Sequence, residues 1–185
     1  MTILAFRHAP VALAGICYGQ LDVETSLSAE DAAAIIAGQL AGIRPARIWS
    51  SPLARCAGPA RALAARLGAP HVVDARLLEI AYGAWEGRAW TTLERDDEAA
   101  YHAWMSAWKT SGPPGGESAL DVEARVRDWW GALDGDGVEA LIAHAGVMRA
   151  LAVITRSMSW EEAMATTLGH LEGERFPNAP VRPCV

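Results

Sequence analysis

The chain has 185 residues, of which 51% are hydrophobic and 21% charged, and its formal net charge at pH 7 is −6. This composition excludes intrinsic disorder, and the acidic balance argues against a general nucleic-acid-binding protein. The longest stretch without charged residues or histidine, Ala9–Leu21, is too short for the ~20 apolar residues of a membrane span. Met1–Phe6 is apolar, but Arg7 and His8 end it before it could form a secretory leader. We therefore expect a cytoplasmic protein with neither a nucleic-acid nor a membrane partner.

Apolar runs and helical periodicities alternate along the chain. They predict strands over residues 2–6, 46–50, 71–73 and 138–143, and helices over 32–43, 52–67, 91–108, 118–133 and from 146 onward. Ser28 has the spacing of a helix cap, and Ser51-Pro52 reads as a cap followed by proline at the first helical position. The alternation predicts an α/β fold, a three-layer α/β/α sandwich around a mainly parallel sheet.

No linker divides the chain, so we expect a single domain over residues 1–185. The helical region over 89–116 is then an insertion that shapes the substrate end of the pocket. Residues 169–185 fit either a final strand or an ordered tail, and nothing in the sequence indicates the oligomeric state.

The carboxyl ends of the predicted strands carry basic residues and histidines, and this is the edge where open α/β sheets bind ligands. The first strand ends in Arg7-His8, and Arg55 lies one turn into the helix after the second. His144 follows the fourth strand, where Ala145 opens another helix. Guanidinium groups and helix N-termini both favour anions, so the concentration of such groups predicts a phosphate pocket. Each residue taken alone also fits an ordinary structural role.

Other phosphate-handling chemistries lack their residues. There is no GxxxxGK[ST] motif, and Arg61 lies five positions after Cys56 rather than the six that a cysteine phosphatase needs. Asp134-Gly135-Asp136 precedes the fourth strand, where a turn is expected. Histidine therefore remains as the candidate nucleophile.

Five segments together resemble the histidine phosphatase superfamily, whose fold is called phosphoglycerate mutase-like. They are Arg7-His8, Ser50–Arg55, Leu78-Glu79 with Tyr82–Gly87, Gly115–Ser118 and Ala143–Arg149. The resemblance implies that His8 accepts the phosphoryl group and that Arg7, Arg55 and His144 hold its oxygens. It also implies that Glu79 donates a proton to the leaving alcohol, with no metal and no cofactor. Positive neighbours keep an imidazole neutral for attack, and guanidinium groups with an imidazolium would stabilise the spreading negative charge.

The segment after Arg7-His8 departs from that family pattern. The family usually has Gly-Glu-Thr here and an Asn three residues later, whereas this chain has Ala9, Pro10, Val11 and Ala14, so two polar phosphate contacts are missing. Backbone N–H groups of the following loop, at Gly19 and Gln20, would replace them, and the N–H of Ala145 would add a further contact. The same loop equally fits an ordinary glycine-rich turn.

The Cys17-Tyr18-Gly19 stretch resembles a subgroup associated with α-ribazole phosphatase, so a small-molecule phosphomonoester such as α-ribazole 5′-phosphate, from cobalamin biosynthesis, is the expected substrate. A phosphoglycerate-type mutase and a phosphoprotein phosphatase are alternatives of the same class. An inactive phosphate-binding protein is an alternative of another class.

Trp104 and Trp108 are one helical turn apart, so they fit either core packing or an aromatic wall over the pocket. His71, His102 and His170 are scattered and read as surface or structural residues.

Overall fold

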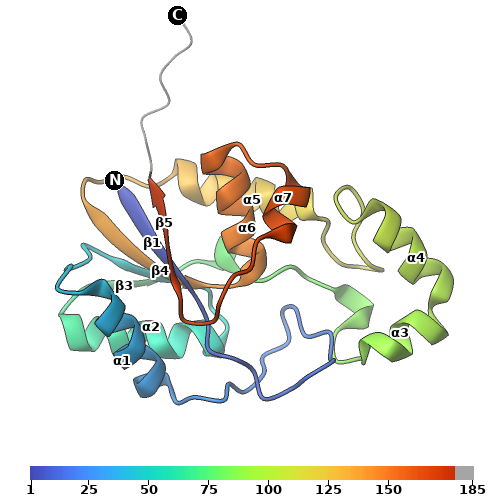
Figure 1. Ribbon diagram of the computed structural model, residues 1–185, viewed down its shortest axis with the longest axis horizontal. Helices are drawn as coiled ribbons and strands as arrows, with labels where there is room; N and C mark the ends of the chain where they lie inside the picture. The colour runs from blue at the N-terminus through green and yellow to red at the C-terminus, as the bar shows by residue number, and fades with distance from the viewer. Residues whose placement is uncertain (178–185) are drawn as a thin grey trace, which may run out of the picture.

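The computed structural model describes residues 1–177, and a five-stranded sheet in the order β3-β2-β4-β1-β5 forms its centre (Figure 1). The strands are β1 Thr2–Arg7, β2 Ile48–Ser50, β3 His71–Val73, β4 Val138–Ala143 and β5 Gly173–Pro177. The first four run parallel, and β5 adds an antiparallel edge to β1. The prediction of a mainly parallel sheet is confirmed. Residues 169–185 were expected to form either a final strand or an ordered tail, and residues 173–177 form the strand β5. Residues 178–185 lie outside the part of the chain that the structure describes.

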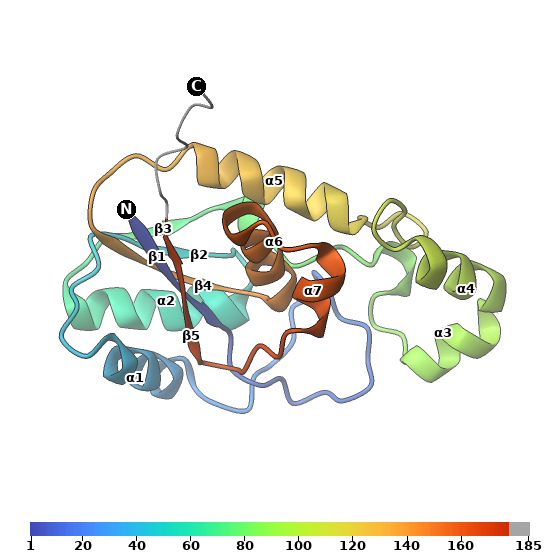
Figure 2. The same ribbon diagram turned by 45° about the horizontal axis from the view of Figure 1, so that its top comes forward.

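Helices cover both faces of this sheet, as Figure 2 shows. They are α1 Ala29–Leu40, α2 Ala54–Leu67, α3 Trp90–Asp96, α4 Glu98–Ala107, α5 Ala119–Gly131, α6 Ala145–Arg156 and α7 Trp160–Ala165, with short 3₁₀ turns at Ala75–Leu77 and Gly83–Trp85. Helices α1 and α2 lie on one face, and α5 and α6 lie on the other (Figures 1 and 2). Within residues 1–177, no helix is long and apolar enough to cross a membrane.

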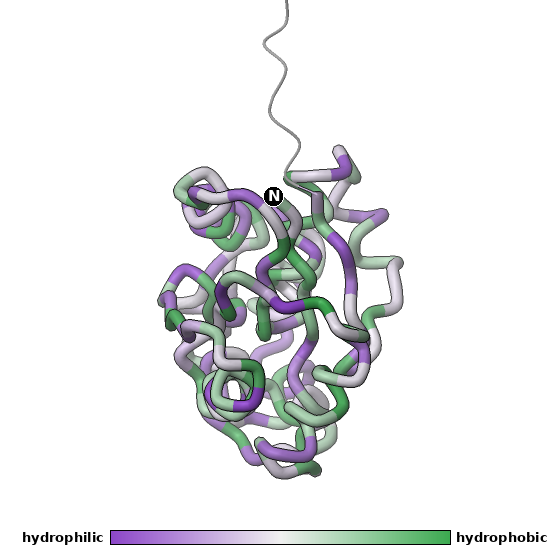
Figure 3. The backbone as a smooth tube through the Cα atoms, turned by 90° about the vertical axis from the view of Figure 1, so that its left-hand side faces the viewer, coloured by the Kyte–Doolittle hydropathy of each residue, from purple (hydrophilic) through white to green (hydrophobic). Residues whose placement is uncertain are grey.

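Side-chain alternation along the central strands explains the two cores. In β1, Ile3 and Ala5 pack toward α5 and α6, whereas Phe6 packs toward α1 and α2. The neighbouring β4 repeats this pattern, with Leu141 on the first side and Ile142 on the second. The outer helices mix hydrophobic and hydrophilic residues along their length (Figure 3), as expected for helices with one buried face.

The structure corrects the expected start of α2. Ser51 and Pro52 lie before the helix, whose cap position is Leu53 and whose first residue is Ala54. The side chain of Leu53 makes no capping bond, and the Asp22 carboxylate of a distant loop accepts the Ala54 N–H at 3.0 Å instead. The local pattern around Ser51-Pro52 could not reveal this cap, because the accepting carboxylate lies 32 residues upstream in the sequence. The predicted end of this helix at residue 67 is confirmed, and Gly68 follows it with a left-handed φ of 66°.

The predicted helix over 91–108 is two helices, α3 and α4, which meet at Asp97 and which we call the helical lobe. The lobe lies to one side of the sheet (Figure 1) and has a small core of its own. That core packs Cys17, Leu93 and Trp85 against a ring of aromatic residues, namely Tyr82, Trp90, Tyr101 and Trp104. The Arg88 guanidinium also binds the Asp97 carboxylate at the point where the two helices meet.

Candidate active site

The register of the two central strands brings His8 and His144 together. Parallel strands β1 and β4 pair Arg7 with Ala143, so the residue after each strand emerges at the same edge of the sheet. The His8 N–H donates to the Ala143 carbonyl at 3.0 Å, which fixes the two strand ends to each other. The imidazole centroids are 5.3 Å apart, and the side chains are 1% and 0% exposed. The prediction that these two histidines meet is confirmed.

Two arginines flank the pair. Arg55, in the first turn of α2, donates from Nη1 to the Leu21 carbonyl at 2.8 Å and from Nη2 to the Gly19 carbonyl at 2.5 Å. Arg7 donates from Nη1 to the Leu168 carbonyl at 3.0 Å. The Nε–H groups of both arginines are buried, and neither has an acceptor among residues 1–177. Two buried donors aimed at no acceptor fit a site for an oxyanion, since unpaired buried N–H groups are costly.

The hydrogen bonds of His8 select its reactive nitrogen. Nδ1 lies 2.7 Å from the Ala9 carbonyl, and because a carbonyl can only accept, Nδ1 carries the proton and Nε2 keeps its lone pair. The pKa of His8 is lowered to about 3, chiefly by burial and also by the positive charges of Arg55 and Arg7, whereas the Ala9 bond acts in the opposite direction. At neutral pH the imidazole is therefore the neutral form that can attack.

His144 differs from the expected imidazolium. Complete burial, with the positive charge of Arg55 as the next cause, holds the pKa of His144 well below its usual value. The Cys56 thiol packs against this ring, with Sγ 3.5 Å from Nε2, and burial raises the pKa of that thiol, so it brings no compensating charge. His144 is thus neutral near pH 7, and one of its two ring nitrogens carries a proton that it can donate. A phosphate dianion beside it would raise its pKa toward the protonated form.

Glu79 reaches the site from the loop after β3. Its Oε1 accepts the N–H groups of Ile80 at 3.0 Å and of Gly146 at 3.1 Å, which places the carboxyl group against the first turn of α6. A side chain at position 146 would overlap this oxygen, so the close approach requires glycine. Burial raises the pKa of Glu79, although the Ile80 bond opposes the shift. A carboxyl group whose pKa is raised keeps its proton to a higher pH and is better suited to serve as a proton donor.

The Glu79 loop is held by a residue that the sequence did not single out. Arg125 of α5 donates from Nη1 to the Arg76 and Leu78 carbonyls at 2.7 Å and from Nη2 to the Glu79 carbonyl at 3.1 Å. Its guanidinium is in turn paired with Glu117 at 2.9 Å. Arg125 is a positioning residue, and no local pattern in the sequence distinguishes it from Arg127, the other arginine of α5.

The loop that follows β1 is tied down by bonds of its own. The Gln20 N–H donates to Glu86 Oε1 at 2.9 Å, and the Gln20 amide donates to the Glu79 carbonyl at 3.0 Å. The Gly19 carbonyl accepts a hydrogen bond from Arg55 Nη2. The expected phosphate contact from the Gln20 backbone would therefore require the bond to Glu86 to break. Ala145 is the first residue of α6, where a backbone N–H has no partner within the helix.

A third imidazole completes the cluster: His170 was expected to be a surface or structural residue scattered away from the site, but it lies beside His8. His170 precedes β5, and its ring centroid is 5.4 Å from that of His8. Its Nδ1 donates to the His8 carbonyl at 2.7 Å. The edge of the sheet thus presents Arg55, His144, His8 and His170 in spatial order, which follows the strand order. Nothing near His170 in the sequence signals this, because its place depends on β5 pairing with β1.

This geometry agrees with comparisons to known proteins. The model of the histidine phosphatase superfamily (branch 1) matches residues 3–172, and the chain belongs to that family. A glucosyl-3-phosphoglycerate phosphatase of Mycobacterium tuberculosis is 36% identical over 144 residues, which cover 72% of this chain but 64% of that protein, less than two thirds of its length.

Two solved structures resemble this one. The α-ribazole phosphatase of Shigella flexneri aligns with a TM-score of 0.86 at 20% identity, over 95% of this chain and 89% of that one. A mycobacterial glucosyl-3-phosphoglycerate phosphatase aligns with a TM-score of 0.79 at 28% identity, over 94% and 88%. The first likeness shows the phosphoglycerate mutase-like fold alone, because so few residues are identical.

Proposed function

We propose that this protein is a phosphomonoester hydrolase that works through a phosphohistidine at His8. One observation carries the proposal. Two imidazoles lie 5.3 Å apart at the strand ends, between two arginines whose buried Nε–H groups have no acceptor within residues 1–177. A phosphoryl group has three equatorial oxygens on which negative charge spreads in the transition state, and fixed guanidinium donors complement them.

In the first step the lone pair of His8 Nε2 attacks phosphorus. A P–N bond forms, the ester P–O bond breaks, and its electron pair stays on the alcohol oxygen. The proton of the Glu79 carboxyl group passes to that oxygen, so the alcohol leaves neutral and Glu79 becomes a carboxylate. Throughout the step the Nδ1–H of His8 remains on the Ala9 carbonyl and holds the ring in place.

In the second step the Glu79 carboxylate takes a proton from water while the water oxygen attacks phosphorus. The P–N bond breaks, and its electron pair returns to His8 Nε2. Inorganic phosphate leaves, and both Glu79 and His8 recover their starting forms. Neither step calls for a metal ion, and within residues 1–177 no group of three or more His, Cys, Asp or Glu is placed to hold one.

The test uses hydrolysis of phenyl phosphate in EDTA. We expect the wild-type protein to release phosphate and His8→Ala to lose at least about 10³-fold in kcat, as on removal of a nucleophile. His102→Ala, which removes an exposed histidine of the helical lobe, should keep wild-type activity. Mass spectrometry of rapidly quenched protein should locate the phosphoryl group on His8. Equal activity of wild type and His8→Ala would overturn the assignment. The absence of hydrolysis would favour the inactive phosphate-binding alternative.

We further propose a small-molecule phosphomonoester as substrate. α-Ribazole 5′-phosphate brings an aromatic base, and glucosyl-3-phosphoglycerate, named for the mycobacterial relatives, brings a carboxylate. Phosphate release from these two esters, compared with a phosphoserine peptide, separates small substrates from protein substrates. A mutase would instead transfer the phosphoryl group to a second hydroxyl and release little free phosphate.

A further inference from the structure

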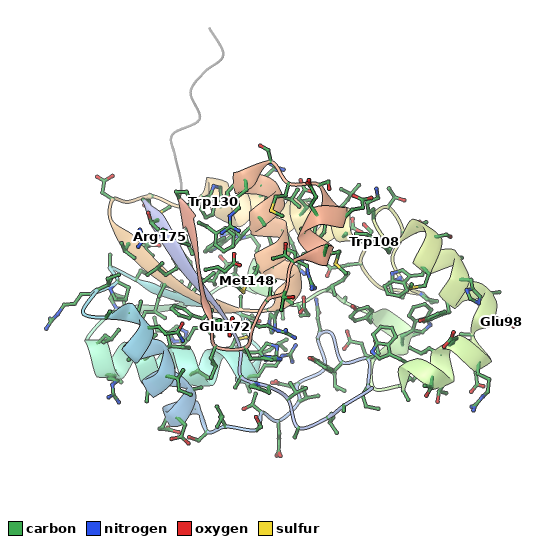
Figure 4. All side chains as sticks on the ribbon, in the orientation of Figure 1. Glu98, Trp108, Trp130, Met148, Glu172 and Arg175 are labelled. Atoms are coloured by element: carbon green, nitrogen blue, oxygen red, sulfur yellow. The ribbon has the colours of Figure 1, made fainter. Side chains whose placement is uncertain are left out.

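An apolar cavity adjoins the site on the side of Glu79. Its volume is about 220 Å³, and it lies between the Glu79 loop, α4, α6 and α7. Its aromatic lining comes from Tyr82, Trp104, Trp108 and Trp160. Trp108, labelled in Figure 4, lies where the helical lobe meets the helices that cover the sheet, and its ring meets Trp160 edge-on at 6.2 Å. The cavity is therefore built by segments far apart in the sequence.

This cavity is the place for the alcohol part of a substrate. Glu79 and Gly146 belong to its lining, and the carboxyl group of Glu79 is the proton donor to the alcohol oxygen. A second cavity of about 360 Å³ borders Arg55, but Asp22 and Glu24 also line it. Two carboxylates there would repel an anionic ester, whereas the aromatic cavity adds no carboxylate beyond Glu79.

One cation faces this apolar lining. Arg149 is on α6, one turn after Ala145, and it is half-buried. Its Nε donates to the Ala163 carbonyl at 3.3 Å, and no carboxylate within residues 1–177 lies within 4 Å of its guanidinium nitrogens. Burial lowers the pKa of Arg149, with Glu79 as an opposing charge and Arg7 as a like charge. A poorly solvated guanidinium without a carboxylate partner favours an incoming anion, which it can bind through two parallel hydrogen bonds.

The size of the cavity limits what it accepts. An apolar cavity of ~150 Å³ holds a benzene ring, so about 220 Å³ holds one ring together with a substituent the size of a carboxylate. Resting on the phosphatase function proposed above, we propose that the preferred substrate is the phosphate ester of an alcohol that carries a single apolar or aromatic ring and a carboxylate. The ring packs against the tryptophans, and Arg149 binds the carboxylate. Arg149 is thus a specificity-determining residue.

Matched esters isolate the carboxylate. The probes are 3- and 4-carboxybenzyl phosphate, the corresponding carbamoylbenzyl phosphates, which have the same shape without the charge, and benzyl phosphate. For the wild-type protein we expect kcat/KM to be at least about tenfold higher for the better carboxylate isomer than for its amide, as for one charge-assisted hydrogen-bonded pair. In Arg149→Gln this ratio should fall to about one. Arg66→Gln, which removes an exposed guanidinium of α2, should keep the wild-type ratio.

Two further measurements keep the outcomes distinct. Hydrolysis of all esters with equal kcat/KM for acid and amide, or a ratio that survives in Arg149→Gln, would overturn the carboxylate assignment and leave the phosphatase function intact. If no ester is hydrolysed, calorimetric binding of the same ester pairs still tests Arg149, because binding does not require turnover. An acid that binds no tighter than its amide then overturns the inference. Thermal melting of both variants checks that they fold.

Discussion

The strand-end edge of the sheet and the helical lobe contribute to the site in opposite ways. At the edge, polar and charged groups are buried, and each is fixed by backbone hydrogen bonds, as His8 is by Ala9 and Arg55 is by Gly19 and Leu21. In the lobe, aromatic rings pack on one another, with Trp90 stacked on Trp104 at 6.0 Å. Hydrogen bonds therefore fix the side chains of the edge, whereas the burial of apolar surface stabilises the lobe.

This difference indicates that the edge carries out the reaction, whereas the lobe determines which esters are preferred. The register of β1 and β4 allows one placement of the two imidazoles, whereas the packing of rings in the lobe tolerates many sequences. A change at the edge should therefore alter the rate for every ester, and a change in the lobe should alter the ranking of esters. Each prediction below tests one side of this division.

Among the four changes that follow, Glu79→Gln at the edge is expected to give the largest effect. The loss of the proton donor should lower kcat for ethyl phosphate by about 10²- to 10⁴-fold. The loss should be much smaller for p-nitrophenyl phosphate, because its leaving group departs without a proton. Glu94→Gln, at an exposed carboxylate of the lobe, serves as the control. A similar loss for both esters would mean that Glu79 does not protonate the alcohol.

Acid should destabilise the protein through a buried group of the edge. His8 has a pKa of about 3 in the folded protein and about 6.5 when unfolded, so the unfolded chain binds more protons between these values and stability falls as pH drops below 6.5. At pH 5 this single group costs about 2 kcal/mol relative to pH 7.5. Urea unfolding of wild type and His8→Asn should therefore differ by about that amount in the drop from pH 7.5 to pH 5. Equal drops in the two proteins would show that His8 is protonated in the folded state.

In the lobe, Trp104→Leu tests the selection of esters. An aromatic contact is worth about 0.5–1.5 kcal/mol, so kcat/KM for benzyl phosphate should fall by about 2- to 12-fold, with a smaller fall for ethyl phosphate. Trp130→Leu removes a tryptophan of α5 outside the cavity (Figure 4) and should leave the ratio of the two esters unchanged. If Trp104→Leu lowered kcat/KM equally for both esters, the lobe would not select between esters, and the proposed difference between the two regions would be wrong.

His170 is expected to give the smallest effect. Replacing it with leucine removes the bond to the His8 carbonyl, worth about 0.5–1.5 kcal/mol, and kcat should fall by several-fold. Asparagine keeps a donor near that position, so His170→Asn should recover part of the lost kcat. If His170 only filled space, leucine would instead be the better replacement. Rapid-quench measurement of the rate of His8 phosphorylation in both variants distinguishes the hydrogen-bonding role from the space-filling role.

The sequence predicted the fold and the histidine pair because both follow from short-range patterns. Apolar runs and their alternation locate the parallel strands, and residues that follow adjacent parallel strands must share an edge. Glu79 came from the family resemblance, since its loop has no periodic pattern. His170 and Arg125 could not be predicted, because their places depend on β5 pairing with β1 and on the path of the Glu79 loop.

Helix boundaries show the same limit. Ser118 and Asp121 lie three residues apart and form the complete capping box at the start of α5, so the sequence located that start. The start of α2 was misplaced because its cap, Asp22, comes from another part of the chain. Likewise, the division of the lobe into α3 and α4 rests on aromatic packing and on the Arg88–Asp97 pair rather than on a glycine or proline.

The alternation along β1 also governs where this chain can change in length. One residue added between Ile3 and His8 would turn the imidazole to the opposite face of the sheet, because successive side chains of a strand point to opposite sides. Insertions in the segment between α4 and α5 meet no such restriction. Family members should therefore differ in size within the connecting segments while the count of residues from the first apolar position of β1 to the nucleophile stays constant.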